Sequence, residues 1–561
     1  MLYEELRTAW KELTAPGAPF EVVSAEVRGH PCLIYRNAPS SVRHLWLATA
    51  AYGEREYIVY QDERVTYAEA HAKVAAIAGW LASRGVKRGG RVAIAMRNYP
   101  EWMLIYWACV ASGVAAVGMN AWWVAEEMAY ALADSAPQVV FCDAERLARL
   151  PLATGVTVVA VRIDAEPGVV PFSEVLAHPG ALPEIAVDAD DDACIFYTSG
   201  TTGVPKGAQL THRGCISNLF SMMFAGQCQA LAMARATGVA IDPAAPPPIP
   251  VGLLTTPLFH VTANNCGAYA LTAAGGKMVL MYRWDAGEAL RLIEQEKVSA
   301  MSGVPVMARE VINHPDFATR DTSSLLSLAG GGAQLPPDLV GKIDEAVATA
   351  RPGTGYGLTE TCGIITSVGA DFFVGKPDSA GPVMPDFEFK CVDDDYQTVT
   401  EGLVGELWVR GAQVIKGYLN RPEATAEAIT DGWFHTGDIA RIDADGFLYI
   451  VDRKKDMILR GGENIYCAEV EAAAYRHPAV AECSAFGVPD PRLGEEVALA
   501  AVPHHGQTLS AGELRDFLAV GMARHKVPRY IWILAEPLPR NASGKFLRRE
   551  LRDRLSIAEA A

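Results

Sequence analysis

Short β-rich segments alternate with helical patterns over much of this chain, and this alternation restricts the fold more than any other feature. The apolar runs that predict strands lie at residues 91–96, 114–117, 138–143, 156–161, 278–281 and 298–301. Amphipathic or apolar helical patterns lie between them at residues 100–112 and 286–297. A strand–helix–strand order is typical of parallel sheets covered by helices. The sequence therefore predicts an α/β fold with parallel or mixed sheets.

The pattern changes towards the C-terminus. Short strands separated by Gly and Asp at residues 387–392, 405–410 and 447–451 indicate a small antiparallel β subdomain, spanning about 387–452. A charged run at residues 453–456 follows this subdomain, and after it begins a new α+β unit of ordinary domain length. We predict a large N-terminal domain, 1–454, and a small mobile C-terminal domain, 455–561. The Ala- and Pro-rich stretch at 225–250 is predicted to be a surface loop.

Charge and apolar runs limit the partners. The net charge of −17 argues against nucleic acid as a partner and against loose binding to anionic membranes. Residues 103–125 carry no charge, yet Gly113, Gly118 and Asn120 interrupt the run. We therefore expect a buried helix followed by a buried strand, with no transmembrane segment, although peripheral membrane contact stays open. The adjacent Trp122 and Trp123 are expected in the core.

The cysteines favour a reducing compartment. The 11 cysteines are scattered, with no Cys-x-x-Cys pair and no metal-ligand spacing with His. A zinc site or a disulfide framework is not expected, and a cytoplasmic location follows from reduced thiols.

The segment at residues 197–207, YTSGTTGVPKG, carries the strongest chemical signal. It follows an apolar run at 193–196 and contains three glycines, four Ser or Thr hydroxyls and a lysine. Exposed N–H groups and hydroxyls bind polyphosphate oxygens, and a lysine neutralises them. The alternative, a tight strand-to-helix turn, requires fewer of these groups. We predict a phosphate loop, distinct from a Walker A loop, formed by Thr198, Ser199, Gly200, Thr201, Thr202, Gly203 and Lys206.

Four more segments follow in order, and with this loop they resemble the signatures of the adenylate-forming superfamily. That superfamily includes acyl-CoA synthetases, peptide-synthetase adenylation domains and beetle luciferases. The segments are residues 355–361 (GYGLTET), 433–438 (WFHTGD), 452–456 (DRKKD) and 539–545 (PRNASGK). The resemblance spans nearly the whole chain and implies that ATP and Mg²⁺ bind here.

Joining a carboxylate to the α-phosphate of ATP brings two anions together, so the protein must supply positive charge and alignment. Lys206 can neutralise the leaving pyrophosphate. Glu360 can hold magnesium, and the resemblance implies that Thr198 is its hydroxyl partner. Asp438 and Arg453 can bind the ribose, and Lys545 can reach the reacting oxygens. The resemblance places these further residues at the nucleotide: Gly331, Gly332, Ala333, Gly355, Tyr356, Gly357, Thr359 and Ile450.

The resemblance also places an acid-binding pocket around His260, where it implies a residue that lines and gates the acyl channel. Domains that load α-amino acids generally have an aspartate in this region, and this sequence has Phe259-His260-Val261 instead. The acid is therefore expected to lack an α-amino group. The other predicted acyl-binding residues are Thr262, Val304, Met307, Gly330 and Gly331. For Val304 and Met307, ordinary core packing is the alternative.

Two segments are predicted to serve a second step. Lys455 is the expected hinge, and the loop Arg460, Gly461, Gly462 and Glu463 resembles the one that acyl-CoA ligases bring to the site for thioester formation. A hairpin turn is the alternative for this loop.

The resulting expectation is an ATP-dependent ligase that joins a hydrophobic acid, either a medium- or long-chain fatty acid or one of similar bulk, to coenzyme A. Three alternatives stay open: transfer to a carrier-protein thiol, the acyl-adenylate itself as the product, and a catalytically silent AMP- or acyl-binding protein. A homodimer is also open.

Overall fold

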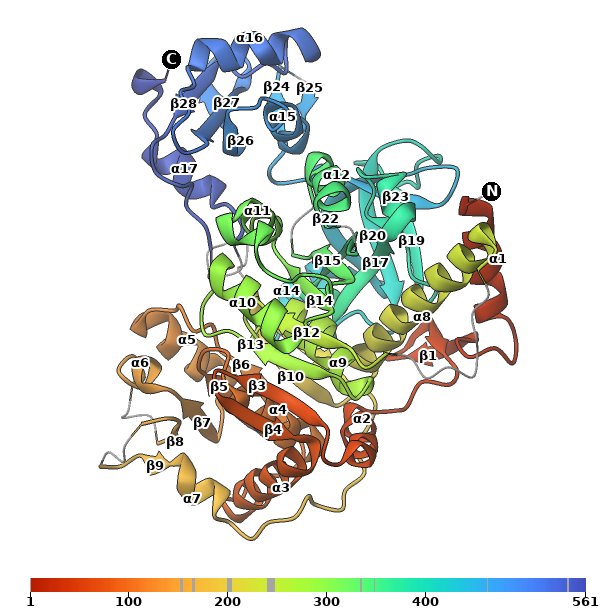
Figure 1. Cartoon of the computed structure of the whole chain (residues 1–561), viewed down its shortest axis with the longest axis vertical. Coiled ribbons are helices and arrows are strands. Elements are labelled where there is room, and N and C mark those ends of the chain that lie inside the picture. Colours follow the sequence, from red (N-terminus) through yellow and green to blue (C-terminus); the bar gives the residue numbers. More distant parts are fainter. Residues whose placement is uncertain are drawn as a thin grey trace.

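A computed structural model shows five sheets with helices around them (Figure 1). The structure describes residues 2–151, 155–163, 167–198, 204–239, 248–332, 335–347, 349–461, 463–541 and 544–560. The phosphate-loop residues Ser199, Gly200, Thr201, Thr202 and Gly203 lie outside these ranges, as do Ala333 and Gly462. No helix in the described ranges is long and apolar enough to cross a membrane.

The first large sheet is mostly parallel and follows the predicted strand–helix order. Its seven strands are, in spatial order, β11 (Lys206–Thr211), β10 (Asp192–Thr198), β6 (Ala115–Gly118), β5 (Arg91–Ala95), β7 (Val139–Cys142), β8 (Thr157–Ala160) and β9 (Val170–Pro171). Only the β10–β11 pair is antiparallel. The helices next to these strands in the chain are α3 (Tyr67–Ser83), α4 (Pro100–Ala111), α5 (Ala125–Ser135), α6 (Ala144–Leu147) and α7 (Phe172–Leu176). The uncharged run at 103–125 is thus confirmed as a buried helix, α4, followed by a buried strand, β6.

The second large sheet has eight strands. They are β17 (Gly363–Gly369), β16 (Arg351–Leu358), β15 (Ser327–Gly330), β14 (Ala300–Gly303), β12 (Val251–Leu254), β13 (Lys277–Leu280), β3 (Glu56–Tyr60) and β4 (Glu63–Thr66). The associated helical elements are α2 (Val42–Ala48), η1 (Thr49–Tyr52), α8 (His212–Thr237), the π-helical η2 (Thr262–Ala268), α9 (Tyr269–Ala273), α10 (Ala286–Glu296), α11 (Pro305–Asn313), η3 (Pro315–Ala318), α12 (Pro337–Ala346), η4 (Thr359–Thr361) and α13 (Ala370–Val374). The predicted helix at 286–297 and the strands on either side of it are confirmed.

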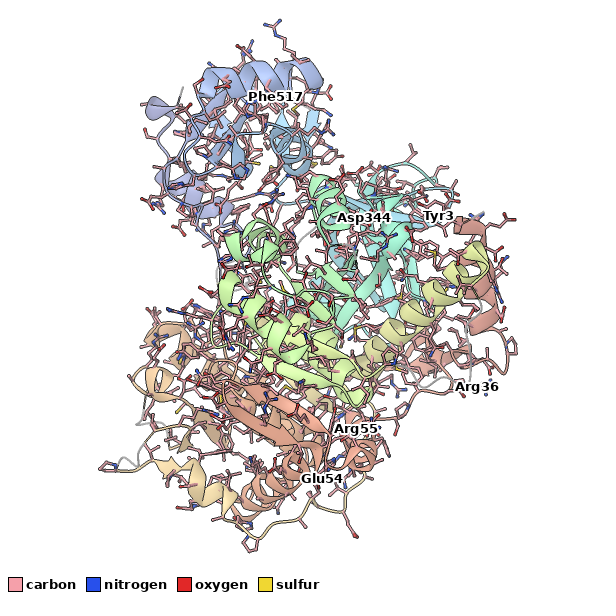
Figure 2. The ribbon with its side chains drawn as sticks, viewed as in Figure 1. Tyr3, Arg36, Glu54, Arg55, Asp344 and Phe517 are labelled. Atoms are coloured by element: carbon pink, nitrogen blue, oxygen red, sulfur yellow. The ribbon has the colours of Figure 1, made fainter. Side chains whose placement is uncertain are left out.

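The third sheet is the predicted antiparallel β subdomain. Its strands are β18 (Gly381–Pro382), β23 (Phe447–Arg453), β22 (Trp433–Ile442), β20 (Gly405–Gly411) and β19 (Phe387–Val392), with β21 (Ile429–Thr430) beside β22 and helix α14 (Pro422–Ala428) just before it. The N-terminal helix α1 (Leu2–Thr14) and the hairpin β1 (Val22–Val27) and β2 (His30–Tyr35) complete the large body. Tyr3 of α1 is labelled in Figure 2. Its ring packs edge-on against Phe447 of β23, with 5.3 Å between the ring centroids.

The C-terminal part forms a separate small body at the top of Figure 1. Its sheet contains β25 (Glu463–Ile465), β24 (Ile458–Arg460), β27 (Gly494–Pro503), β26 (Val480–Asp490) and β28 (Tyr530–Ile533). Its helical elements are α15 (Cys467–Ala474), α16 (Ala511–Gly521), α17 (Arg548–Arg554) and η5 (Ile557–Glu559). This body has its own apolar core around Val470, Leu499 and Leu514.

Two sequence expectations are wrong. The first part of the stretch at 225–250 is helical rather than a loop, because α8 continues to Thr237. Gly238, whose φ is +71°, caps the end of the helix. Alanines favour helix, and the buried face of this helix packs on α1, with 4.6 Å between the ring centroids of Trp10 and Phe224. Residues 240–247 lie outside the described ranges. Trp123 is buried as expected, but the side chain of Trp122 is 43% exposed.

Candidate active site

The phosphate segment connects two antiparallel strands rather than a strand and a helix. Thr198 ends β10 and pairs in register with Lys206, the first residue of β11. Lys206 Nζ lies 5.1 Å from the centroid of the Tyr418 ring, and the Tyr418 hydroxyl donates to Glu360 Oε1 at 2.9 Å. Tyr418 therefore connects the predicted pyrophosphate lysine to the predicted magnesium ligand.

Glu360 and Thr198 fit a magnesium ion that is shared with ATP. Glu360 lies in η4, directly after the glycine-rich strand β16, and forms no ion pair with any described residue. The described residues contain no cluster of three His, Cys, Asp or Glu side chains that could hold a metal alone. Magnesium usually binds through one or two carboxylates, with substrate phosphates and water completing its octahedron. The Glu360 carboxylate, which accepts the Tyr418 hydroxyl, suits that role, with Thr198 as its predicted hydroxyl partner.

Three predicted nucleotide-binding residues come together from three strands. Asp438 on β22 is buried and pairs in register with Arg453 on β23. Its carboxylate lies 3.2 Å from Arg453 Nε and accepts a hydrogen bond from the Tyr356 hydroxyl of β16 at 2.5 Å. Burial raises the pKa of Asp438, and the charge of Arg453 opposes that rise. Ile450 lies on β23, three residues before Arg453, and is half-buried.

Lys545 from the small body lies close to the charges of this site. The pKa of Lys545 is lowered to about 8 in total: loss of hydration is the largest cause, the charges of Arg453 and Lys455 add to the lowering, and the charges of Asp438 and Glu360 oppose it. The Lys545 backbone N–H donates to Asn541 Oδ1 at 2.9 Å, which holds the loop that carries the lysine. The predicted C-terminal lysine is therefore within electrostatic reach of both nucleotide-binding carboxylates.

Most of the predicted acid-pocket residues lie close together, next to the loop that carries Lys545. A β-carbon added to Gly331 would lie 3.2 Å from Thr262 Cγ2, and one added to Gly544, next to Lys545, would lie 2.8 Å from Val304 Cγ2. Gly332 has a φ of +77° and also faces Thr262 and Val304. Only small residues fit at these positions.

Two predicted acid-pocket residues have other neighbours. Gly330 is directed towards Leu335, since a β-carbon there would lie 2.8 Å from Leu335 Cδ1. Met307 packs against Gly303 and lines an adjacent pocket that also contains Phe259.

His260 is uncharged near neutral pH. Its pKa is lowered to about 4, mainly by burial and also by the charge of the nearby Lys545. Its Nε2 atom is buried and forms no hydrogen bond with any described residue. An uncharged imidazole can contact an apolar group without introducing a charge.

The contacts around Lys455 change from one body to the other. The Lys454 backbone N–H donates to the Gly437 carbonyl at 2.9 Å, and Lys454 Nζ lies 3.1 Å from Glu406, both in the large body. Asp456, two residues later, pairs at 2.8 Å with Arg548 of the small body. Lys455 therefore lies between two residues, one anchored to the large body and the other to the small body.

The predicted thioester loop is the turn between β24 and β25. Arg460 pairs with Glu496 of β27, and Gly461, with a φ of +61°, donates its N–H to the Leu493 carbonyl at 2.7 Å. Glu463 is exposed at the start of β25. These contacts all lie within the small body. Among the described residues, Lys545 and not this loop is the part of the small body that faces Asp438 and Glu360.

Sequence reasoning missed Tyr418. It contacts Glu360 across 58 residues of sequence and forms an isolated bridge with Ala208 of β11. No local pattern distinguishes this tyrosine from the 18 others, since its role depends on a contact that is distant in sequence.

The fold and the arrangement of Lys206, Glu360, Asp438 and Lys545 define an adenylate-forming enzyme, and comparison with known proteins agrees. The model of the AMP-binding enzyme family matches residues 45–419, and that of the AMP-binding enzyme C-terminal domain matches residues 469–545. The chain belongs to the AMP-binding enzyme family.

Its relatives include several acid–CoA ligases. A feruloyl-CoA synthase from Amycolatopsis sp is 36% identical over 493 residues, covering 87% of this chain and 94% of the relative. A long-chain-fatty-acid–CoA ligase from Mycobacterium tuberculosis is 33% identical over 504 residues, covering 88% and 94%. Among solved structures, the o-succinylbenzoate CoA synthetase from Bacillus subtilis, in complex with its acyl-adenylate intermediate, has a TM-score of 0.76 and 30% identity, covering 91% of this chain and 98% of that one.

Proposed function

We propose that this chain, an AMP-forming acid–CoA ligase, activates a hydrophobic carboxylic acid. The acid and ATP form an acyl-adenylate and pyrophosphate, and CoA then displaces AMP to give acyl-CoA. The observation that carries the proposal is the position of Lys545 within the field of Asp438 and Glu360, beside the pocket around His260. A solved o-succinylbenzoate CoA synthetase in complex with ATP and a magnesium ion supports the same cofactors here.

Each charged side chain then has a role in adenylation. Asp438 and Arg453 orient the ribose. Lys206 neutralises the departing pyrophosphate. Lys545 offsets the charge that builds up where the carboxylate attacks the α-phosphate. Magnesium, held by Glu360 and Thr198, would neutralise the phosphate oxygens.

The neutral pocket supports a hydrophobic acid. Its described walls are glycine backbone, Thr262, Val304 and the uncharged His260. None of them is a carboxylate that could pair with an α-ammonium group. The relatives act on feruloyl, long-chain fatty and succinylbenzoate acids, so medium- or long-chain fatty acids and bulky aromatic acids are the classes to compare.

A panel of acids tests this proposal. Pyrophosphate release is measured with fatty acids of increasing length, with aromatic acids and with α-amino acids, each with CoA, with a carrier protein or with no acceptor. We expect release with hydrophobic acids and thioester formation with CoA. Release only with α-amino acids, or a thioester only on the carrier protein, would contradict it.

His260 is predicted to control which acid is accepted. His260→Ala removes an uncharged wall beside the acyl group, so the profile of kcat/KM against acid length should change severalfold. The KM for ATP should change little, because Asp438, Arg453 and Lys206 are unaltered. A changed KM for ATP with an unchanged acid profile would move His260 out of the pocket.

The pKa of Lys545 predicts an alkaline limit for adenylation. In the free enzyme this pKa is lowered from the usual 10.5 to about 8, so the side chain loses its charge as the pH rises through that value. The kcat/KM of pyrophosphate exchange, which reports free-enzyme pKa values, should fall over the same range. Lys545→Arg keeps its charge at this pH, so any residual rate should continue to higher pH. An unchanged alkaline limb in this variant would assign the limb to another group.

We also infer that residues 1–454 and 455–561 turn relative to each other about Lys455. The change of anchoring between Lys454 and Asp456 supports this pivot. A turn at this point would withdraw Lys545 and bring Arg460, Gly461, Gly462 and Glu463 to the same site, so that one pocket serves both steps.

A further inference from the structure

The segment 415–419 connects the backbone of β11 to that of η4. The Leu419 N–H donates to the Gly207 carbonyl of β11 at 2.8 Å, and the Ile415 N–H donates to the Glu360 carbonyl of η4 at 2.9 Å. These two hydrogen bonds lie at opposite ends of the segment. It therefore links the strand that begins with the predicted pyrophosphate lysine to the short helix that carries the predicted magnesium carboxylate.

The side chain of Tyr418 lies between two opposite charges that do not pair with each other. Lys206 Nζ lies 5.1 Å from the centroid of its ring, and its hydroxyl donates to Glu360 Oε1 at 2.9 Å. Neither Lys206 nor Glu360 forms an ion pair in the part of the chain that the structure describes. A cation–π contact and a hydrogen bond from a neutral hydroxyl leave both charges in place. Both side chains therefore keep their charge available for a ligand.

Tyr418 is itself held in one position. It is buried, and its N–H donates to Thr425 Oγ1 of α14 at 2.9 Å. It also forms an antiparallel bridge with Ala208 of β11. A β-carbon added to Gly417, the preceding residue, would lie 2.9 Å from Thr425 Cγ2, so the chain passes too close to α14 for a side chain there. Because the tyrosine is ordered before a ligand binds, little entropy is lost in ordering it when the nucleotide arrives.

We propose that Tyr418 is a positioning residue for adenylation, which holds Lys206 and Glu360 apart and directs each to its own part of the magnesium–ATP complex. The inference rests on the proposed ligase function, in which Glu360 holds magnesium and Lys206 neutralises the pyrophosphate. The hydroxyl orients the carboxylate, and the ring orients the ammonium group. Without this side chain, the lysine and the glutamate are free to pair with each other instead of with the nucleotide. The two contacts use different parts of one side chain, so each can be removed separately.

The first measurement is metal-dependent binding without catalysis. The Kd for α,β-methylene-ATP, which cannot be adenylated onto an acid, is determined by calorimetry with Mg²⁺ and again with EDTA. The ratio of the two Kd values reports how strongly the metal tightens binding. Tyr418→Phe keeps the ring and removes the hydroxyl that orients Glu360, so this ratio should fall about tenfold, as for the loss of other hydrogen-bond partners of metal ligands.

The second measurement is the KM for pyrophosphate in the exchange reaction at saturating Mg²⁺. Tyr418→Phe should leave this KM close to the wild-type value, because the ring beside Lys206 is kept. Tyr418→Leu removes the ring as well as the hydroxyl, so it should raise the KM for pyrophosphate severalfold in addition to its effect on the metal. A purely structural role would change both quantities in both variants.

Tyr449→Phe is the matched control, because the Tyr449 hydroxyl also donates to a carboxylate, Asp443 Oδ2 at 3.0 Å, next to the turn that joins β22 and β23. It should leave both measurements unchanged, and melting temperatures confirm that each variant is folded. An unchanged Kd ratio in Tyr418→Phe, or an equal effect of this variant on the metal and on pyrophosphate, would overturn the inference alone. A wild-type Kd that does not depend on Mg²⁺ would overturn the magnesium role of Glu360 together with it.

Discussion

Lys545→Ala is expected to reduce adenylate formation by several orders of magnitude and to leave the second half-reaction largely intact. The side chain lies in the field of Asp438 and Glu360, where we propose that the carboxylate and the α-phosphate meet. Loss of a preorganised charge contact in a transition state costs about 3–4 kcal/mol.

The measurement pairs two assays on one preparation: pyrophosphate exchange, and conversion of supplied acyl-adenylate to acyl-CoA. Lys526→Ala is a control, since Lys526 pairs with Glu469 on the exposed surface of the small body. Equal loss of both half-reactions in Lys545→Ala would contradict the proposal that Lys545 acts in adenylate formation and not in thioester formation.

Lys455→Pro is expected to separate the two half-reactions in the opposite sense. Lys454 is anchored to the large body and Asp456 to the small one, so a rotation requires large φ and ψ changes at Lys455. Proline restricts φ to near −65° and also restricts Lys454 before it. If the trapped orientation is the present one, pyrophosphate exchange should persist while acyl-CoA formation falls by orders of magnitude, and adenylate should accumulate on the enzyme.

Lys455→Ala controls for loss of the side chain, because it leaves the backbone free to rotate. Thermal melting confirms that the proline variant is folded. A folded Lys455→Pro enzyme with both half-reactions intact would show that the pivot lies elsewhere or that rotation is not required.

The sequence by itself determined the class of fold and supplied the residues proposed for the nucleotide site. The strands at β5, β7, β8 and β13 were predicted to within about two residues, because apolar runs bounded by turn residues reflect local burial. The five motifs predicted Lys206, Glu360, Asp438, Arg453 and Lys545 as site residues, and in the structure Lys545 lies in the field of Asp438, Arg453 and Glu360, while Tyr418 contacts both Glu360 and Lys206.

The tertiary structure alone decided which surfaces face each other. The stretch after residue 225 is helical because α1 covers its apolar face, and composition does not reveal that partner. Tyr418 reaches Glu360, and Trp122 stacks with Arg97, through contacts between segments far apart in sequence or in separate elements. The sequence around a residue indicates its secondary structure and whether it is buried. The charge and shape of a pocket depend on side chains from several elements, which come together only when the chain folds.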